Sequence, residues 1–269
     1  MSHNSFYIHD GEGPFVAAAI HSGHRVRSEL KPLLNLTEME RLREEDPHTD
    51  WLTIVAPARI ICLKSRFEVD LNRKRDHAVY LTPADAWGLR AWKEEPVEEV
   101  VNRSLAIYDT FYNEVKKFLS SVIDKHGYVV VYDLHTYNYR RDGADSPPAD
   151  PQENPDVNLG TANLNRDVWG PVVDGLADNL RSFDFPGKQL DVRENIRFRG
   201  GHFSRWIQQE FGDRSCAIAI EFKKFFMDEW SDDYDRQQLT AIRDALQESV
   251  PGMLRRSRQI AGKSDEVTQ

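Results

Sequence analysis

Residues 128–137 read YVVVYDLHTY, an apolar, β-branched run that ends in polar and ionisable side chains. Three other short runs are continuously apolar in the same way. Such runs are typical of strands buried on both faces of a sheet, whereas half-exposed strands alternate. The predicted strands are residues 15–20, 58–63, 128–132 and 216–220. Together they predict a largely parallel sheet.

Helical patterns separate these strands. In the clearest one, apolar residues recur at steps of three and four from Val97 to Val122. It ends at Lys125, His126 and Gly127, a standard C-terminal signal. Further helices are predicted at residues 37–45, about 167–181, 203–211 and 235–254, the last with a bend at Pro251. Strands that alternate with helices predict an α/β sandwich.

Composition narrows the class of protein. The 269 residues, 40% of them hydrophobic, suit a single α/β domain over residues 1–269. We expect a core at about residues 14–255 and a polar, frayed tail at 256–269. The 44 acidic and 35 basic residues give a net charge of −9, which argues against a nucleic acid partner. Small-molecule chemistry remains, and an anionic substrate must then meet a locally basic pocket.

The sequence also bears on compartment. No window approaches the roughly 18 apolar residues of a membrane span, and the N-terminus has no signal-peptide pattern. We therefore expect a soluble, cytoplasmic protein without a membrane partner. Cys62 and Cys216 lie beside apolar residues and are predicted to be buried free thiols. The oligomeric state is not predicted.

Residues 137–165 differ from the rest of the chain. They are rich in Pro, Asp, Asn and Gly, and they have no apolar period. A segment of this length is too long for an ordinary connection in a compact domain. It is predicted to be either a functional lid or a disordered segment, and it holds no readable information on substrate specificity.

Polar side chains follow the predicted strands. His21 follows the first, Asn72 and Arg73 follow the second extended region, His135 follows the third, and Glu221 closes the fourth. In open parallel sheets, ligand sites form at the carboxyl ends of the strands. These side chains are therefore expected to converge on one crevice.

The histidines suggest a metal site. His21 runs from an apolar strand into a Gly-containing turn, and a lone histidine there also fits a structural hydrogen-bonding role. His135 favours the metal site, because Asp133, two residues earlier on the same strand face, can orient it. Two strand-end histidines and a carboxylate have the composition of a catalytic zinc site.

Glu221 ends an apolar strand, where burial should raise its pKa. A carboxylate there can act as general base toward a water molecule and then as acid toward the leaving amine. The alternative is a strand-end salt bridge to Lys223, which lies on the same face.

Two further groups suit an anionic substrate. Arg66 and Arg73 can each grip a carboxylate with a planar guanidinium, whereas Lys74 and Arg75 are predicted to be a solvated turn. Gly200, Gly201 and His202 form a turn into a helix whose N-terminal amides can bind an anion or oxyanion.

Seven motifs, in order, carry a resemblance to a known family. They are HSGH at 21–24, REEDPHTD at 43–50, SRFEVDLNR at 65–73, DLHTY at 133–137, PDVNLGT at 155–161, RFRGGH at 197–202 and IEFKKFFMDE at 220–229. Over about residues 14–230 they resemble the N-formylglutamate amidohydrolase family, which is similar in turn to zinc carboxypeptidases and aspartoacylase-type deacylases.

The resemblance implies a fold and a set of roles. The fold is a three-layer α/β/α sandwich around a mainly parallel mixed sheet, zinc-carboxypeptidase-like (phosphorylase/hydrolase-like). One zinc or similar divalent ion per chain is implied, with His21 and His135 as ligands. Asn72 and Arg73 are implied to bind a substrate carboxylate, and Glu221 to be the catalytic carboxylate.

One departure concerns the third metal ligand. Zinc carboxypeptidases take a glutamate three residues after the first histidine, whereas that position is His24 here. Asp46 fits the acidic motif of the family most closely, with Asp50, Glu45 or His24 as rivals. Glu44 and Glu45 are otherwise predicted to be a solvated helix end.

The leading hypothesis is metal-dependent hydrolysis of a linear amide, N-formyl-L-glutamate to formate and L-glutamate. A deacylase or carboxypeptidase acting on another N-acyl amino acid or short peptide would use the same residues. A non-catalytic binding protein on this fold is a third reading, but such a protein has no need of His21, His135 and Glu221 together.

Overall fold

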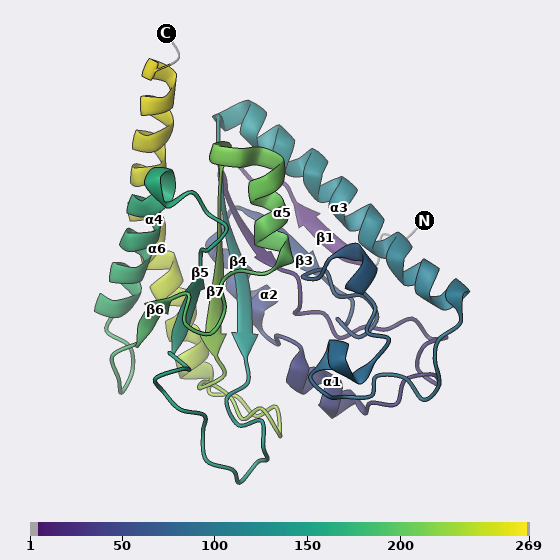
Figure 1. The fold of residues 1–269 in the computed structure, drawn as a ribbon. Helices are drawn as coiled ribbons and strands as arrows, with labels where there is room; N and C mark the ends of the chain where they lie inside the picture. Colours follow the sequence, from purple (N-terminus) through teal and green to yellow (C-terminus); the bar gives the residue numbers. More distant parts are fainter. Residues whose placement is uncertain (1–4, 268–269) are drawn as a thin grey trace.

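The computed structural model describes residues 5–267, and it describes side chains as far as residue 262. At its centre is a seven-stranded sheet in the order β1-β3-β2-β4-β7-β5-β6 (Figure 1). Strands β3, β2, β4 and β7 run parallel, while β1 and the β5–β6 pair are antiparallel to them at the two edges. The strands are β1 (Phe6–His9), β2 (Phe15–Ala19), β3 (Ala58–Cys62), β4 (Val129–Tyr137), β5 (Val157–Gly160), β6 (Val192–Glu194) and β7 (Ser215–Lys223).

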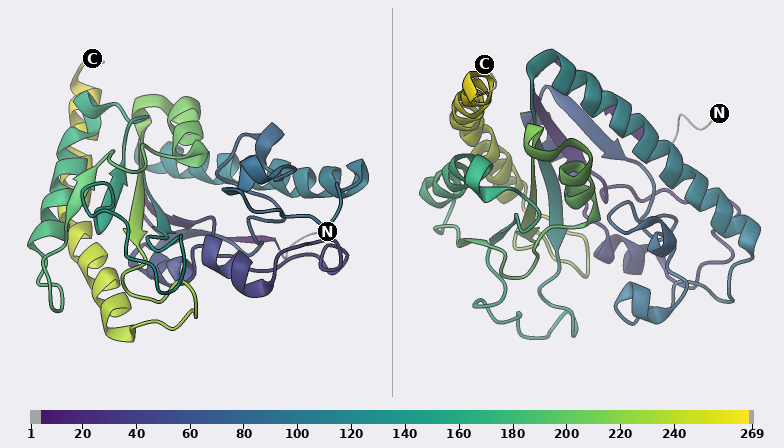
Figure 2. Two further views of the ribbon diagram at one scale, coloured as in Figure 1. Left: turned by 60° about the horizontal axis from the view of Figure 1, so that its bottom comes forward. Right: turned by 45° about the horizontal axis from the view of Figure 1, so that its top comes forward.

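Helices cover both faces of the sheet. Helices α3 (Glu98–His126) and α5 (His202–Phe211) pack on one face, and α4 (Arg166–Ser182) and α6 (Arg236–Val267) pack on the other (Figure 2). Alternate residues of each strand supply the two cores, because successive side chains point to opposite faces. This confirms the three-layer α/β/α sandwich with a mainly parallel mixed sheet.

The four strands predicted from continuous apolar runs are confirmed as β2, β3, β4 and β7. Strands β4 and β7 extend further than predicted, because their polar ends pair with each other in parallel register as far as Tyr137 and Lys223. His135 therefore lies inside β4 and not after it, and Glu221, predicted to close its strand, is followed in β7 by Phe222 and Lys223.

Helix α3 matches its prediction closely. Its apolar stripe is buried against the sheet, and Gly127 ends it in the left-handed conformation with φ 80°. A residue with a side chain rarely adopts that conformation, which explains the glycine. The short elements are α1 (Glu38–Glu44), α2 (Thr49–Leu52) and the 3₁₀ turns η1 (Thr53–Val55), η2 (Arg75–His77), η3 (Pro83–Ala86) and η4 (Gly212–Arg214).

Of two predictions about irregular segments, one is wrong in part and one is wrong. Residues 157–160 of the segment 137–165 form β5, which pairs with β7 and so extends the sheet, while a lid function of the remainder stays a prediction. The predicted frayed tail continues α6 to Val267. Within this extension Ser257 is buried, and Ile260 and Ala261 pack against the core shared with α4.

Two further observations bear on the composition. Within residues 5–267, no helix is both long and apolar enough to cross a membrane. Cys62 and Cys216 are buried free thiols, as predicted.

The α6 extension leads to a stability prediction. Truncation after Arg255 removes Ser257, Ile260 and Ala261 from the core, so we expect the free energy of unfolding to fall by about 1–3 kcal/mol. Truncation after Gly262 is the matched control, because it keeps these three residues. Denaturant unfolding monitored by circular dichroism measures both. Equal stability of the two truncated proteins would contradict the packing of this segment.

Candidate functional site

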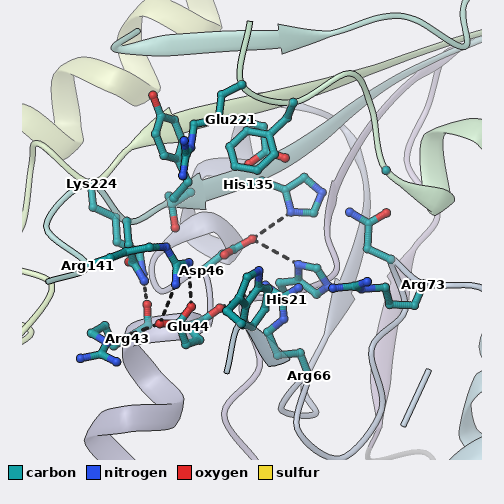
Figure 3. A pocket seen from close by; sticks show the side chains of 18 of the residues that line it. His21, Arg43, Glu44, Asp46, Arg66, Arg73, His135, Arg141, Glu221 and Lys224 are labelled. Carbon is teal, nitrogen blue, oxygen red and sulfur yellow. Dashed lines mark hydrogen bonds and ion pairs between the residues drawn. The ribbon is translucent and has the colours of Figure 1, made fainter. Parts of the chain in front are cut away.

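Three predicted site residues gather at the carboxyl ends of the parallel strands (Figure 3). His21 follows β2, His135 lies in β4, and Asp46 lies between α1 and α2. One nitrogen or oxygen atom of each lies within 4.8 Å of the others. Asp46 Oδ2 is 2.8 Å from His135 Nδ1 and 3.5 Å from His21 Nδ1. All three side chains are buried.

The outer nitrogen of each histidine faces a second carboxylate. His21 Nε2 lies 2.7 Å from Asp70 Oδ1, and His135 Nε2 lies 3.0 Å from Asp133 Oδ1. Asp133 thus occupies the orienting position expected from the sequence. Asp70 was missed, although it lies two residues before Asn72 in the DLNR motif. Such outer carboxylates set the tautomer and direction of the rings, which here turn both Nδ1 atoms toward Asp46.

The electrostatics of the cluster favour a cation. Burial by itself would raise the pKa of Asp46, but hydrogen bonds and charge from His135 and His21 hold it well below its usual value. Burial lowers the pKa of His135, yet the charges of Asp133 and Glu221 outweigh it and raise the pKa well above the ordinary range. The same negative charges that favour a proton on His135 would favour a metal cation beside it.

The segment that carries Asp46 is fixed by buried contacts. The Asp46 amide donates to the carbonyl of His21 at 3.0 Å. The ammonium of Lys224 donates to the carbonyls of Arg43 at 2.6 Å and Glu45 at 2.9 Å. Lys224 is almost fully buried at the end of β7, and burial lowers its pKa to about 8. Lys224 is not predicted from the sequence, because nothing in a KK pair distinguishes a buried lysine from a solvated one.

The rivals of Asp46 lie elsewhere. Glu45 Oε2 is 2.6 Å from His24 Nδ1, and Glu45 Oε1 accepts the hydroxyl of Ser65. Asp50 is exposed. Among the four candidate residues for the third position, Asp46 is the one that the structure places between the two histidines.

The prediction of a solvated helix end at Glu44 and Glu45 is wrong, because both are buried. Glu44 lies 2.9 Å from Arg141 and 3.4 Å from Arg43. Glu45 lies 3.7 Å from Arg41 and 2.6 Å from His24. Arg141 and His24 are distant in sequence from these glutamates, so the helix sequence alone does not reveal their burial.

Glu221 lies beside His135. The two residues are partners in the parallel register of β7 and β4. Burial raises the pKa of the Glu221 carboxyl to about 7, although the nearby His135 opposes the rise. The alternative salt bridge to Lys223 is wrong, because that ammonium lies 2.9 Å from Asp156 instead. Within residues 5–262, the Glu221 carboxylate makes no hydrogen bond or ion pair.

These residues open onto a cavity of about 320 Å³. Three acidic side chains line it, Glu44, Asp46 and Glu221, against seven cationic ones. The cationic residues are Arg43, Arg66, Arg73, Arg141, Arg197, Arg199 and Lys224. The locally basic pocket expected in this acidic chain is therefore present. Arg43, Arg141, Arg197 and Arg199 were not predicted as site residues; the RFRGGH motif was the signal for the last two.

Arg66 lines the cavity with its nitrogens engaged. Its guanidinium contacts the Tyr80 hydroxyl at 3.0 Å, the Glu44 carbonyl at 3.1 Å and Asp70 at 2.9 Å. This arrangement supports Asp70, which in turn holds His21. A direct contact of Arg66 with substrate stays a prediction.

Arg73 is freer. Its side chain is 40% exposed, lies 3.8 Å from Asp70, and donates to the Asp85 carbonyl at 3.3 Å. Figure 3 shows it beside His21, on the side away from Lys224 and Arg141. The neighbouring Lys74 and Arg75 are exposed, as predicted.

Asn72 also lines the cavity, and Gly201 packs against it. Its Oδ1 accepts the amide of Phe203 at 3.0 Å, in the first turn of α5. A Cβ added at Gly201 would lie 2.1 Å from Asn72 Oδ1, so only glycine leaves room for this amide. Gly200, with φ 103°, also needs the conformational freedom of glycine.

His202 does not face the cavity. Its Nε2 lies 3.0 Å from the Tyr108 hydroxyl, and its ring lies 5.7 Å from the ring of Tyr112. It is absent from the residues that line the cavity. Its predicted contact with substrate therefore lacks support from the geometry.

Comparisons with known proteins point to one family. The family model of N-formylglutamate amidohydrolase matches residues 13–227. A search of curated proteins finds no match. The chain is similar to the crystal structure of N-formylglutamate amidohydrolase from Ralstonia eutropha JMP134, with a TM-score of 0.72 and 18% identity over 95% of this chain and 98% of that one. It is also similar to a gene product of Agrobacterium tumefaciens, with a TM-score of 0.64 and 13% identity over 93% and 96% of the two chains.

The contact between Gly201 and Asn72 leads to a prediction. Because φ at Gly201 is −81°, alanine is allowed by the backbone, but its methyl group must displace the Asn72 side chain. We expect Gly201→Ala to lower the free energy of unfolding by about 1–3 kcal/mol. Thermal unfolding measures this, with Gly262→Ala as control because its added methyl meets nothing within 4 Å. Equal unfolding temperatures of Gly201→Ala and the wild type would contradict the close packing.

Proposed function

Because the chain belongs to the N-formylglutamate amidohydrolase family, a family of hydrolases that cleave amide bonds, we propose that it hydrolyses N-formyl-L-glutamate to formate and L-glutamate. The observation that carries this proposal is the buried His21–Asp46–His135 cluster beside Glu221 in a basic cavity. Neighbouring strands and a fixed loop hold these groups, so the site is rigid before a substrate binds.

We propose that His21, Asp46 and His135 hold one divalent metal ion, most simply zinc. The donor set of two imidazole nitrogens and one carboxylate oxygen is typical of catalytic zinc sites. Asp70 is hydrogen-bonded to the outer nitrogen of His21 and Asp133 lies 3.0 Å from that of His135, so both Nδ1 atoms remain for the ion. A bound ion would polarise the acyl carbonyl and make a water molecule more acidic.

Glu221 would carry the protons. Its carboxylate takes a proton from the water molecule that attacks the formyl carbon. The C–N bond then breaks, and Glu221 returns the proton to the departing nitrogen of glutamate. Burial raises the pKa of the Glu221 carboxyl to about 7, and a metal cation beside it would lower that value, which favours the carboxylate form that accepts the first proton. The absence of a salt bridge between Glu221 and Lys223 supports this role.

Arg73 and Asn72 would bind a carboxylate of the substrate. Arg73 is exposed to the cavity and only weakly engaged by Asp70, so its guanidinium is available for bidentate contact. The volume of about 320 Å³ is near the lower end of ligand pockets, which favours a small N-acyl amino acid over a peptide. A screen of N-formyl, N-acetyl and N-succinyl amino acids with the metal-loaded protein tests the substrate. Faster turnover of an N-acetyl or N-succinyl compound would replace the formyl group in this proposal.

The metal site gives one prediction. We expect the wild type to retain one equivalent of metal and His135→Ala to retain almost none, because one of three ligands and the partner of Asp46 are lost. Elemental analysis after dialysis measures the content. Asp46→Ala and Asp50→Ala form a matched pair: Asp46→Ala should lose metal and the exposed Asp50→Ala should keep it. Full retention by both His21→Ala and His135→Ala would contradict the site.

The role of Glu221 gives a second prediction. Glu221→Gln keeps the shape of the side chain but cannot accept a proton, so turnover should fall by about a hundred- to ten-thousand-fold. Metal content and substrate affinity should change little. Steady-state kinetics measures this, with Lys223→Gln as control for a neighbouring change in charge. A folded, metal-loaded Glu221→Gln protein with near-normal turnover would require another base.

A further inference from the structure

The arginines that line the cavity fall into two groups. Arg43 and Arg141 contact Glu44, and Arg66 and Arg73 contact Asp70. The second group is Arg197 and Arg199, whose guanidinium groups make no hydrogen bond or ion pair with residues 5–262. An uncompensated cation that lines a small cavity can bind an anionic ligand without first giving up a protein partner.

Arg197 is held in place by its backbone. Asn158 Oδ1 accepts the amides of Arg197 at 2.9 Å and Phe198 at 3.3 Å, and Asn158 Nδ2 donates to the Phe198 carbonyl at 2.8 Å. Asn158 is fully buried in β5 and is the register partner of Glu221 in β7. A single buried amide therefore fixes the segment 197–198 beside the carboxylate proposed to be catalytic.

The side chain of Arg197 is also located. Its guanidinium carbon lies 5.9 Å from the ring centre of Tyr137 and 5.7 Å from that of Phe198. Tyr137 follows His135 by two residues in β4, so both side chains point to the same face. Aromatic rings on which a guanidinium rests restrict its motion and favour a defined binding geometry.

Arg73 and Arg197 both line the cavity and belong to segments that leave different strands. Arg73 follows β3, and Arg197 follows β6. Strands β2, β4 and β7, which carry or precede His21, His135 and Glu221, lie between β3 and β6 in the sheet order. The cavity is thus lined by two arginines from separate segments of the chain, one for each carboxylate of a dicarboxylic ligand.

We propose that Arg197 binds the side-chain carboxylate of a dicarboxylic N-acyl amino acid, while Arg73 and Asn72 bind its α-carboxylate; this inference rests on the proposed function. Arg197 is then the residue that distinguishes acidic substrates from their neutral amides. A substrate with a side-chain amide leaves the guanidinium without a charged partner and binds less tightly.

The experiment compares N-formyl-L-glutamate with N-formyl-L-glutamine, which differ only in that group. We expect Arg197→Gln to lower kcat/KM for the glutamate compound by roughly 30- to 1000-fold. The glutamine compound should change by less than about threefold, because it makes no charge-assisted contact there. Arg73→Gln should instead lower both values alike, since both compounds carry the α-carboxylate. Arg214→Gln, an exposed change outside the cavity, is the control for lost positive charge.

Binding of the products provides a readout that does not need turnover. Calorimetry of the metal-loaded protein with L-glutamate and L-glutamine should show a preference for glutamate in the wild type and in Arg214→Gln, and none in Arg197→Gln. Arg199→Gln tests the neighbouring guanidinium. If Arg199→Gln and not Arg197→Gln removes the preference, the proposal for Arg197 is overturned.

The two proposals fail in different ways. A wild type that hydrolyses N-formyl-L-glutamate, with the preference intact in Arg197→Gln, overturns the role of Arg197 and leaves the function standing. A wild type that hydrolyses no N-formyl amino acid, yet binds glutamate in an Arg197-dependent manner, overturns the function and supports the carboxylate site.

Discussion

The buried carboxylate of Asp46 between two imidazole rings is the contact on which the site depends. An isolated buried charge costs several kcal/mol, so Asp46 is tolerated only while His21 and His135 are beside it. This joins β2, β4 and the segment between α1 and α2 into one unit. The Lys224 ammonium, at the end of β7, also stabilises the segment that carries Asp46 by donating to the carbonyls of Arg43 and Glu45. The same contacts therefore hold neighbouring strands together and shape the candidate site.

The central part of the fold follows from the sequence, and the edges do not. Strands buried on both faces are largely apolar, so β2, β4 and β7 can be predicted from the sequence alone. Strand β3 is also predicted from its apolar run, although alternate residues of it are only partly buried. Strands β1, β5 and β6 have three or four residues each, too few for a pattern, and β5 lies in a segment rich in Pro and Asp. The end of α6 was missed for another reason: its Arg-rich, largely polar sequence shows only a weak apolar stripe.

The residues of the candidate site also differ in whether they can be predicted from the sequence. His21, His135 and Glu221 are predictable because an ionisable residue at the end of a buried strand has few structural explanations. The burial of Glu44, Glu45 and Lys224 is not predictable, since it depends on partners that are distant in the sequence.

The charge of the cavity differs from that of the whole chain. The chain has a net charge of −9, whereas seven cationic side chains line the cavity. Surface charges are screened beyond about 8 Å in physiological salt, so a substrate at the cavity responds to these cations.

The position of the β5–β6 pair has a consequence for how such enzymes diverge. The strands that carry or precede the reactive groups lie in the interior of the sheet, where any change disturbs two neighbours. The segment after β6 is attached near the edge and is held there by hydrogen bonds to Asn158, Leu159 and Asn72. Duplicated copies of such a chain can acquire new substrates through changes in the segment after β6. The reactive groups on the interior strands are then inherited unchanged.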